Sequence, residues 1–208
     1  MKKYLKEKRF YIFILCLIIF LILSILVLKN GVLNIDNNSY LFIKNNLINE
    51  SLTKVVKLFT NLGGALVLIM ISLLMLLFIK DKKTVLIIII NLIIAFLFND
   101  LLKHIFVRSR PDSINWLVTE SGYSFPSGHA MVSMAYYGYL IYLLYLSKNK
   151  YKWLLITLSS IIILLIGISR IYLGVHYLSD VLAGFLVAII YLTIFITVSE
   201  YINDSTHS

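Results

Sequence analysis

Long apolar runs, separated by short polar or charged segments, dominate the pattern of this chain. An α-helix of about 20 apolar residues is long enough to cross the hydrocarbon core of a bilayer. The pattern predicts six membrane-spanning helices, at residues 10–28, 62–79, 84–101, 129–146, 153–168 and 178–198. We therefore expect an all-α integral membrane bundle, formed by a single domain that comprises residues 1–208.

The segment between the first two apolar runs has a different pattern. Residues 36–39 (Asp-Asn-Asn-Ser) are typical of a turn, because these side chains bond readily to nearby backbone. Over residues 40–59, apolar positions recur at helical spacing among Lys44, Lys54 and Lys57. This alternation predicts an amphipathic helix that lies in the membrane interface.

Composition supports the membrane assignment. The chain is 60% hydrophobic and 14% charged, with a mean hydropathy of +0.92, which is unusual for a soluble domain of this size. The net charge of +9 comes from Lys and Arg in the short segments between apolar runs, a distribution typical of membrane topology. We expect the lipid bilayer, and not a nucleic acid, as the partner of this basic chain.

The basic residues also predict an orientation. The side that bears the N-terminus carries eleven Lys and Arg, in residues 1–9, 80–83 and 148–152. The opposite side carries eight, of which Lys103, Arg110 and Arg170 belong to the candidate site described below. Because Lys and Arg accumulate on the cytoplasmic side, we expect both the basic N-terminus and the tail at residues 199–208 to be cytoplasmic, in a cell membrane.

Three polar clusters fall on the opposite, outer face. The first opens a loop over residues 103–128 and contains Lys103, Arg108 and Arg110, followed by Pro111. A single basic residue beside a span is usually an interfacial anchor. Several cations within one short stretch exceed what anchoring needs, and they indicate an anionic ligand.

The second cluster precedes the fourth span. Pro126, Ser127 and Gly128 are typical of a helix start, where free backbone N–H groups and the helix dipole attract a phosphate. A simple helix cap would explain Ser127 and Gly128, but it would leave His129 unexplained. His129 is therefore a candidate general acid or base.

The third cluster lies between the last two apolar runs. His176 and Asp180 are four residues apart, so on a helix they would share a face, and the carboxylate could orient one imidazole nitrogen while the other stays free. Arg170 offers a planar set of donors suited to a phosphate. A water-facing interfacial loop could also carry these residues, but the location of all three clusters on one membrane face favours a site.

Together these residues suit phosphoryl transfer, because cations neutralise the transferring group while one histidine attacks and another protonates the leaving oxygen. A metal site formed by His129, His176 and Asp180 is the alternative. The basic side chains around it would repel a cation, so we expect neither a metal nor another cofactor.

The three clusters contain motifs in a fixed order and spacing. They are Lys103-x6-Arg110-Pro111, Pro126-Ser127-Gly128-His129 and Ser169-Arg170-x5-His176-x3-Asp180. In these motifs the chain resembles the type 2 phosphatidic acid phosphatase (PAP2) family. The resemblance implies that His176 forms a phosphohistidine, that Asp180 holds His176, and that His129 protonates the leaving group and then activates water. It also implies that the phosphate is bound, without metal, by Lys103, Arg110, Ser127, Gly128 and Arg170.

The expected activity is that of a membrane lipid phosphatase acting on a phosphomonoester or diphosphate. Undecaprenyl diphosphate, phosphatidylglycerophosphate and phosphatidate are all candidate substrates, and the lipid would approach sideways from the outer leaflet. A lipid-linked phosphotransferase would use the same histidine. A lipid transporter is a further alternative, but it predicts polar groups near mid-membrane, whereas these lie at the ends of spans.

Overall fold

The computed structural model describes the backbone of residues 2–205 and the side chains of residues 7–202. Within residues 2–205 all regular structure is helical, which confirms the all-α fold. The α-helices are α1 (Lys2–Asn30), α2 (Asn34–Asn46), α3 (Glu50–Thr60), α4 (Ala65–Phe78), α5 (Lys82–Phe106), α6 (Gly128–Leu146), α7 (Lys152–Tyr172) and α8 (Leu178–Ser205). Two short 3₁₀ helices, Asn61–Gly63 and Ser113–Asn115, lie between them.

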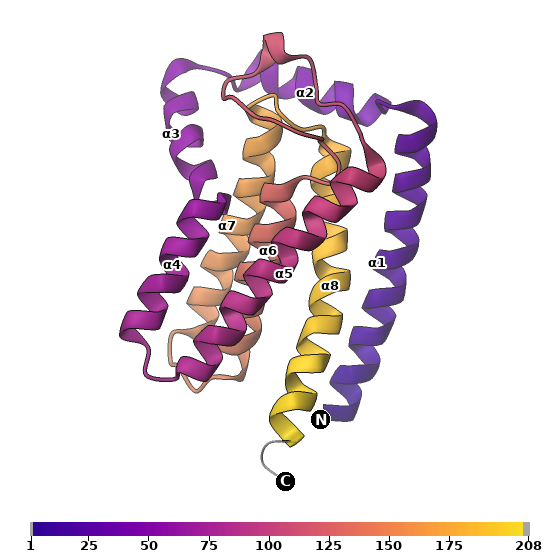
Figure 1. Cartoon of the computed structure of the whole chain (residues 1–208). Helices are drawn as coiled ribbons and strands as arrows, with labels where there is room; N and C mark the ends of the chain where they lie inside the picture. Colours follow the sequence, from indigo (N-terminus) through magenta and orange to yellow (C-terminus); the bar gives the residue numbers. More distant parts are fainter. Residues whose placement is uncertain (1, 206–208) are drawn as a thin grey trace.

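Helix α6 occupies the centre of the bundle, where it packs against α5, α7 and α8. Helix α1 packs on the outside of α8, and α4 packs on α5. Helix α2 crosses one end of the bundle and contacts α7 and α8, while both chain termini lie at the opposite end (Figure 1). The loop that follows α5 covers the end at which α2 lies (Figure 1).

Among the described residues, four helices are long and apolar enough to cross a membrane: α1 from Glu7, α5, α7, and α8 to Ile202. The pair formed by α3 with its 3₁₀ extension and α4 brings the number to five if the pair, which is bent by 55°, is one span. Helix α6 is not among them. Its tyrosines at 136, 137 and 139 are buried against neighbouring helices. Because α6 is enclosed by these helices, it presents little surface to lipid and does not need to be as apolar as they are. The count of six spans stays a prediction.

The turn predicted at residues 36–39 is wrong, because these residues lie inside α2. Asp36 accepts a hydrogen bond from the backbone N–H of Leu33 (3.0 Å), and Ser39 Oγ donates to the carbonyl of Ile35 (2.7 Å). Aspartate and serine can serve a helix start as well as a turn, since both uses satisfy nearby backbone groups. Here the helical use prevails.

The single amphipathic helix predicted at 40–59 is also wrong, because the chain breaks between α2 and α3. Asn49 begins α3 by accepting a hydrogen bond from the N–H of Leu52 (2.8 Å). The phenol of Tyr172 on α7 lies beside this break, 2.9 Å from Thr53 Oγ1. Both helices therefore dock on α7 at separate points.

Two predicted boundaries next to the polar clusters shift by about a turn. Helix α5 continues to Phe106, so Lys103 lies on the last helical turn and not in a loop; Val107 (φ 49°) then ends the helix in the left-handed region. Helix α7 continues to Tyr172, so Arg170 also lies on a helix. Both basic side chains are thereby held on rigid elements.

Candidate active site

The eight predicted site residues come from α5, α6, α7, the start of α8 and the loops that join them, all at the end of the bundle crossed by α2. The ring of His129 lies within electrostatic reach of Lys103, Arg110, Arg170 and His176. Two histidines and three cations that are far apart in sequence are therefore brought together.

His176 precedes α8 and does not share a helical face with Asp180 as the spacing predicted. The contact forms nevertheless: Nδ1 of His176 lies 3.4 Å from Oδ2 of Asp180, and the same oxygen accepts a hydrogen bond from the N–H of Tyr177 (2.9 Å). Asp180 thus caps the start of α8 while facing the imidazole. Both side chains are buried.

The other ring nitrogen of His176 defines its tautomer. Nη1 of Arg110 lies 3.0 Å from His176 Nε2, and a guanidinium can only donate. Nε2 is therefore the unprotonated acceptor, and Nδ1 carries the hydrogen that faces Asp180. Burial, together with the charges of Arg110, Arg170 and Lys103, lowers the pKa of His176 well below its ordinary value. This favours a neutral imidazole whose Nε2 lone pair accepts a hydrogen bond from Arg110.

Arg110 is anchored by the loop that follows it. Its guanidinium donates to the carbonyls of Ser121 (2.8 Å), Gly122 (3.0 Å) and Val175 (3.0 Å). Because these bonds fix the plane of the guanidinium, its orientation is set before any ligand binds.

Arg170 is almost fully buried on α7. Its Nη1 donates to Thr60 Oγ1 (3.0 Å), and Ser169 Oγ donates to the same oxygen (2.9 Å). Nε of Arg170 is buried without a hydrogen-bond partner among the described residues. The guanidinium therefore has donor capacity left for a ligand.

The start of α6 is open to an acceptor. Ser127 is the N-cap residue, its N–H donates to the carbonyl of Asp180 (3.0 Å), and its buried Oγ has no partner among the described residues. A Cβ on Gly128 would lie 2.9 Å from Asn99 Oδ1 and 3.9 Å from Lys103 Cε, so only glycine allows this close approach. Helix N–H groups, a free hydroxyl and a lysine converge here, as an anion site requires.

Comparison with known proteins identifies the family of the chain. Residues 84–204 match the PAP2 superfamily. The chain belongs to this superfamily. Phosphatidylglycerophosphatase B of Bacillus subtilis is 46% identical over 94 residues, which cover 43% of this chain and 45% of that protein. Undecaprenyl-diphosphatase of Sulfolobus acidocaldarius is 32% identical over 189 residues, which cover 86% of each.

Solved PAP2 structures share the fold. The transmembrane PAP2-type phosphatidylglycerolphosphate phosphatase from Bacillus subtilis superposes with a TM-score of 0.78 at 29% identity, over 92% of this chain and 98% of that one. Aquifex aeolicus LpxE, at 24% identity, shares the fold with a TM-score of 0.64 over 79% and 96%. The protein is thus a phosphoric ester hydrolase of the PAP2 lipid-phosphatase type, with a multi-pass membrane bundle.

Three charged residues in contact with this candidate site were not among its eight predicted residues: Glu120, Arg108 and Asp36. Glu120, in the loop, pairs with Arg170 and lies 3.5 Å from Arg110. Arg108 contacts both Asp36 (2.9 Å) and Asp180 (2.5 Å). An arginine in a cationic cluster was visible in the sequence, but nothing in the sequence pairs it with a carboxylate 72 residues away.

The metal alternative finds no additional ligands in the PAP2 site. Within the described part of the chain, no three His, Cys, Asp or Glu side chains gather as a metal site requires. The expectation that catalysis needs no metal stays a prediction, and it is tested below.

Proposed function

We propose that this PAP2 protein removes phosphate from a membrane lipid through a phosphohistidine formed on His176. The observation that carries the proposal is the pair of contacts at His176: Nε2 lies 3.0 Å from Arg110, which can only donate, and Nδ1 lies 3.4 Å from Asp180. A nucleophilic histidine needs this arrangement, because a proton on Nε2 would block attack. Lys103, Arg170, Ser127 and the N–H of Gly128 add donors for the phosphoryl oxygens.

In the first step, Nε2 of His176 attacks phosphorus in line with the leaving oxygen. The N–P bond forms as the P–O bond to the lipid breaks, and His129 gives a proton to the departing oxygen. The ring of His176 becomes positively charged, and the carboxylate of Asp180 stabilises it by accepting the hydrogen bond from Nδ1. The cations balance the charge of the phosphoryl oxygens.

In the second step, His129 accepts a proton from water while the water oxygen attacks phosphorus. The N–P bond breaks, inorganic phosphate leaves, and His176 returns to its neutral tautomer. The two histidines therefore alternate without a net change in proton count at the site.

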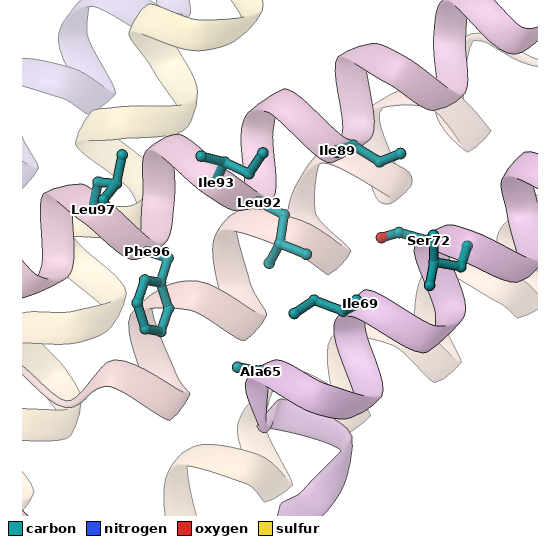
Figure 2. Close-up of a pocket in the computed structure, with 9 residues that line it drawn as sticks. Ala65, Ile69, Ser72, Ile89, Leu92, Ile93, Phe96 and Leu97 are labelled. Carbon is teal, nitrogen blue, oxygen red and sulfur yellow. The ribbon is translucent and has the colours of Figure 1, made fainter.

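A cleft between α4 and α5 supports a lipid substrate. It has a volume of about 370 Å³ and is lined almost entirely by apolar side chains; Leu92 and Phe96 of α5 point into it toward α4 (Figure 2). Ala65 lies at the end of the cleft beside Gly64, where a Cβ would be 3.8 Å from His129 Nε2. A hydrocarbon tail in this cleft would place its headgroup near the cations.

The active end is proposed to face the outside of the cell, with both termini in the cytoplasm. The excess of Lys and Arg on the terminal side supports this orientation, as does the location of the site at the opposite end of the bundle. Ile114, at the exposed tip of the loop, provides the test. An impermeant maleimide should label an Ile114→Cys variant in intact cells, and labelling only after permeabilisation would reverse the orientation.

Phosphate release tests the activity. The purified protein in detergent is given undecaprenyl diphosphate, phosphatidylglycerophosphate or phosphatidate, with no added acceptor. We expect inorganic phosphate from at least one lipid and none from a His176→Ala variant. A His129→Ala variant should also lose most phosphate release, because His129 transfers a proton in both steps. Turnover that survives His176→Ala would refute the nucleophile, and turnover that needs an added hydroxyl acceptor would identify a phosphotransferase.

A further inference from the structure

Arg108 forms a buried junction that the three motifs do not include. It follows Val107, whose left-handed backbone turns the chain away from α5. Its Nη1 donates to Oδ1 of Asp180 (2.5 Å) and to Ser179 Oγ (2.8 Å). Its Nη2 donates to Oδ2 of Asp36 (2.9 Å) and to the carbonyl of Gly31 (2.7 Å). One guanidinium therefore joins the start of α8 to the α1–α2 junction.

Aromatic packing holds Arg108 in place. The guanidinium lies 4.3 Å from the ring centroid of Tyr177 and 5.9 Å from that of Phe125. Arginine over an aromatic face gains cation–π attraction while its edge remains available for hydrogen bonds. The side chain is only 6% exposed, so its charge needs carboxylate partners inside the protein.

Asp36 is the second carboxylate partner of Arg108, after Asp180, and most of the hydrogen bonds that it accepts come from this junction. It is 1% exposed and accepts from the N–H (2.8 Å) and the Oγ (2.9 Å) of Ser179, besides Arg108 and the N–H of Leu33. Ser179 is the neighbour of Asp180. Asp36 therefore fixes both the guanidinium and the backbone beside the carboxylate that faces His176.

We propose that Asp36 and Arg108 are positioning residues that hold the carboxylate of Asp180 with Oδ2 toward Nδ1 of His176. The proposal rests on the function given above, in which His176 is the nucleophile. Arg108 donates a hydrogen bond to Oδ1 of Asp180, and the N–H of Tyr177 donates one to Oδ2. Together these two bonds limit the rotation of the carboxylate. Neither Asp36 nor Arg108 is among the residues that bind phosphate in the proposed mechanism.

The alternative partners of Asp180 explain why positioning is needed. The carboxylate also interacts electrostatically with Arg110 and Lys103, which belong to the phosphate cradle. Without Arg108, Asp180 would be drawn toward these cations and would leave Nδ1 of His176 without its acceptor. The tautomer of the nucleophile and the charge of the cradle would both change.

The test compares Arg108→Gln, Asp36→Asn and the double variant in the full-length protein. A control variant, Glu200→Gln, removes another ion pair between helices: Glu200 on α8 bonds Arg9 on α1 (2.9 Å) at the opposite end of the bundle. For each protein we measure kcat, KM and the thermal unfolding midpoint in detergent, with the best lipid of the panel. The fraction of folded protein is determined by size-exclusion chromatography.

We expect Arg108→Gln to lower kcat by about 100-fold and Asp36→Asn by about 10-fold, with KM changed less than about 2-fold, the range seen when the orienting partner of a catalytic group is removed. The double variant should match Arg108→Gln, because two residues that act in series are not additive. Arg108→Lys should recover part of kcat, since it restores a cation beside Oδ1. Glu200→Gln should keep the kcat of the unaltered protein.

Specific results would overturn the proposal. A rise in KM at constant kcat would place Arg108 in phosphate binding. Equal losses in Glu200→Gln and Asp36→Asn, or losses that follow only the folded fraction, would reduce the junction to a packing contact. If Arg108→Gln does not fold, the result is decided by Asp36→Asn alone, which keeps the size of the side chain but removes its charge and one acceptor oxygen. Turnover in His176→Ala would instead refute the proposed function, and this distinguishes the two failures.

Discussion

Glu120 occupies the place where the cradle would receive phosphate. Its carboxylate pairs with Arg170 and lies 3.5 Å from Arg110, and its side chain is 23% exposed. In the proposed mechanism both guanidiniums bind the phosphoryl oxygens. A phosphate that binds must therefore displace the carboxylate from at least one arginine, and Glu120 acts as an internal competitor.

The free energy needed to displace Glu120 follows from its ion pairs with Arg170 and Arg110. A hydrogen bond to a charged group contributes about 1.5–3 kcal/mol, and partial exposure of Glu120 reduces the loss because water solvates the released carboxylate. Taking about 1–2 kcal/mol for the displacement, a Glu120→Gln variant should bind phosphate about 5- to 30-fold more tightly. The amide keeps the shape of the side chain and removes its charge.

The assay is competitive inhibition of lipid hydrolysis by inorganic phosphate, with the inhibition constant measured for each variant. Asp112→Asn is the matched control, because Asp112 lies in the same loop and its carboxylate accepts from the N–H of Ile114 (3.1 Å). We expect the inhibition constant of phosphate to be lower in Glu120→Gln and unchanged in Asp112→Asn. An unchanged or higher constant for Glu120→Gln would refute the competition and show that Glu120 orients the arginines for phosphate.

Three further predictions concern the nucleophile, the loop before α8 and the charge of the cradle. Because burial and then the neighbouring cations lower the pKa of His176 below the usual 6.5, Nε2 stays unprotonated at lower pH, and the acidic limb of the kcat/KM profile should lie below pH 6.5; a limb above this value would contradict the tautomer. Gly174→Ala should lower the free energy of unfolding by about 2 kcal/mol or more, because its φ is +71° and a Cβ would lie 2.4 Å from the carbonyl oxygen of Asn115. Gly31→Ala, with φ +69° and no atom within 4 Å, should lose only about 1 kcal/mol in the same denaturation measurement. A chelator should leave phosphate release unchanged, since cationic side chains neutralise the phosphate, and a requirement for a divalent ion would refute this.

The sequence was sufficient to predict an all-helical bundle and its polar clusters, but not helix α2 or the break between α2 and α3. Long apolar runs leave few places for polar groups, so Lys103, His129, Arg170 and Asp180 were conspicuous, and the structure places them at one end of the bundle. The helical fold followed from the same pattern. Span boundaries were less predictable, because a polar side chain on the last turn of a helix looks like the start of a loop.

The supporting contacts could not be predicted. Asp36 was expected in a turn, because aspartate among asparagines favours turns and helix starts alike, and only its tertiary partners decide between them. Those partners lie far along the chain: Ser179 is 143 residues away. Glu120 gave no signal either, since a lone acidic residue in a polar loop is usually solvated.

The location of Asp36 has a consequence for the smallest polypeptide that can be active. Residues 84–204 contain all three motifs and the whole match to the superfamily, yet the carboxylate that shares Arg108 with Asp180 comes from the second helix. A fragment that begins at residue 84 would retain the nucleophile, the acid and the cradle, but it would leave a buried guanidinium half neutralised. Co-expression with a separate peptide that comprises residues 1–83 should restore turnover to such a fragment, and the same peptide with Asp36→Asn should restore much less.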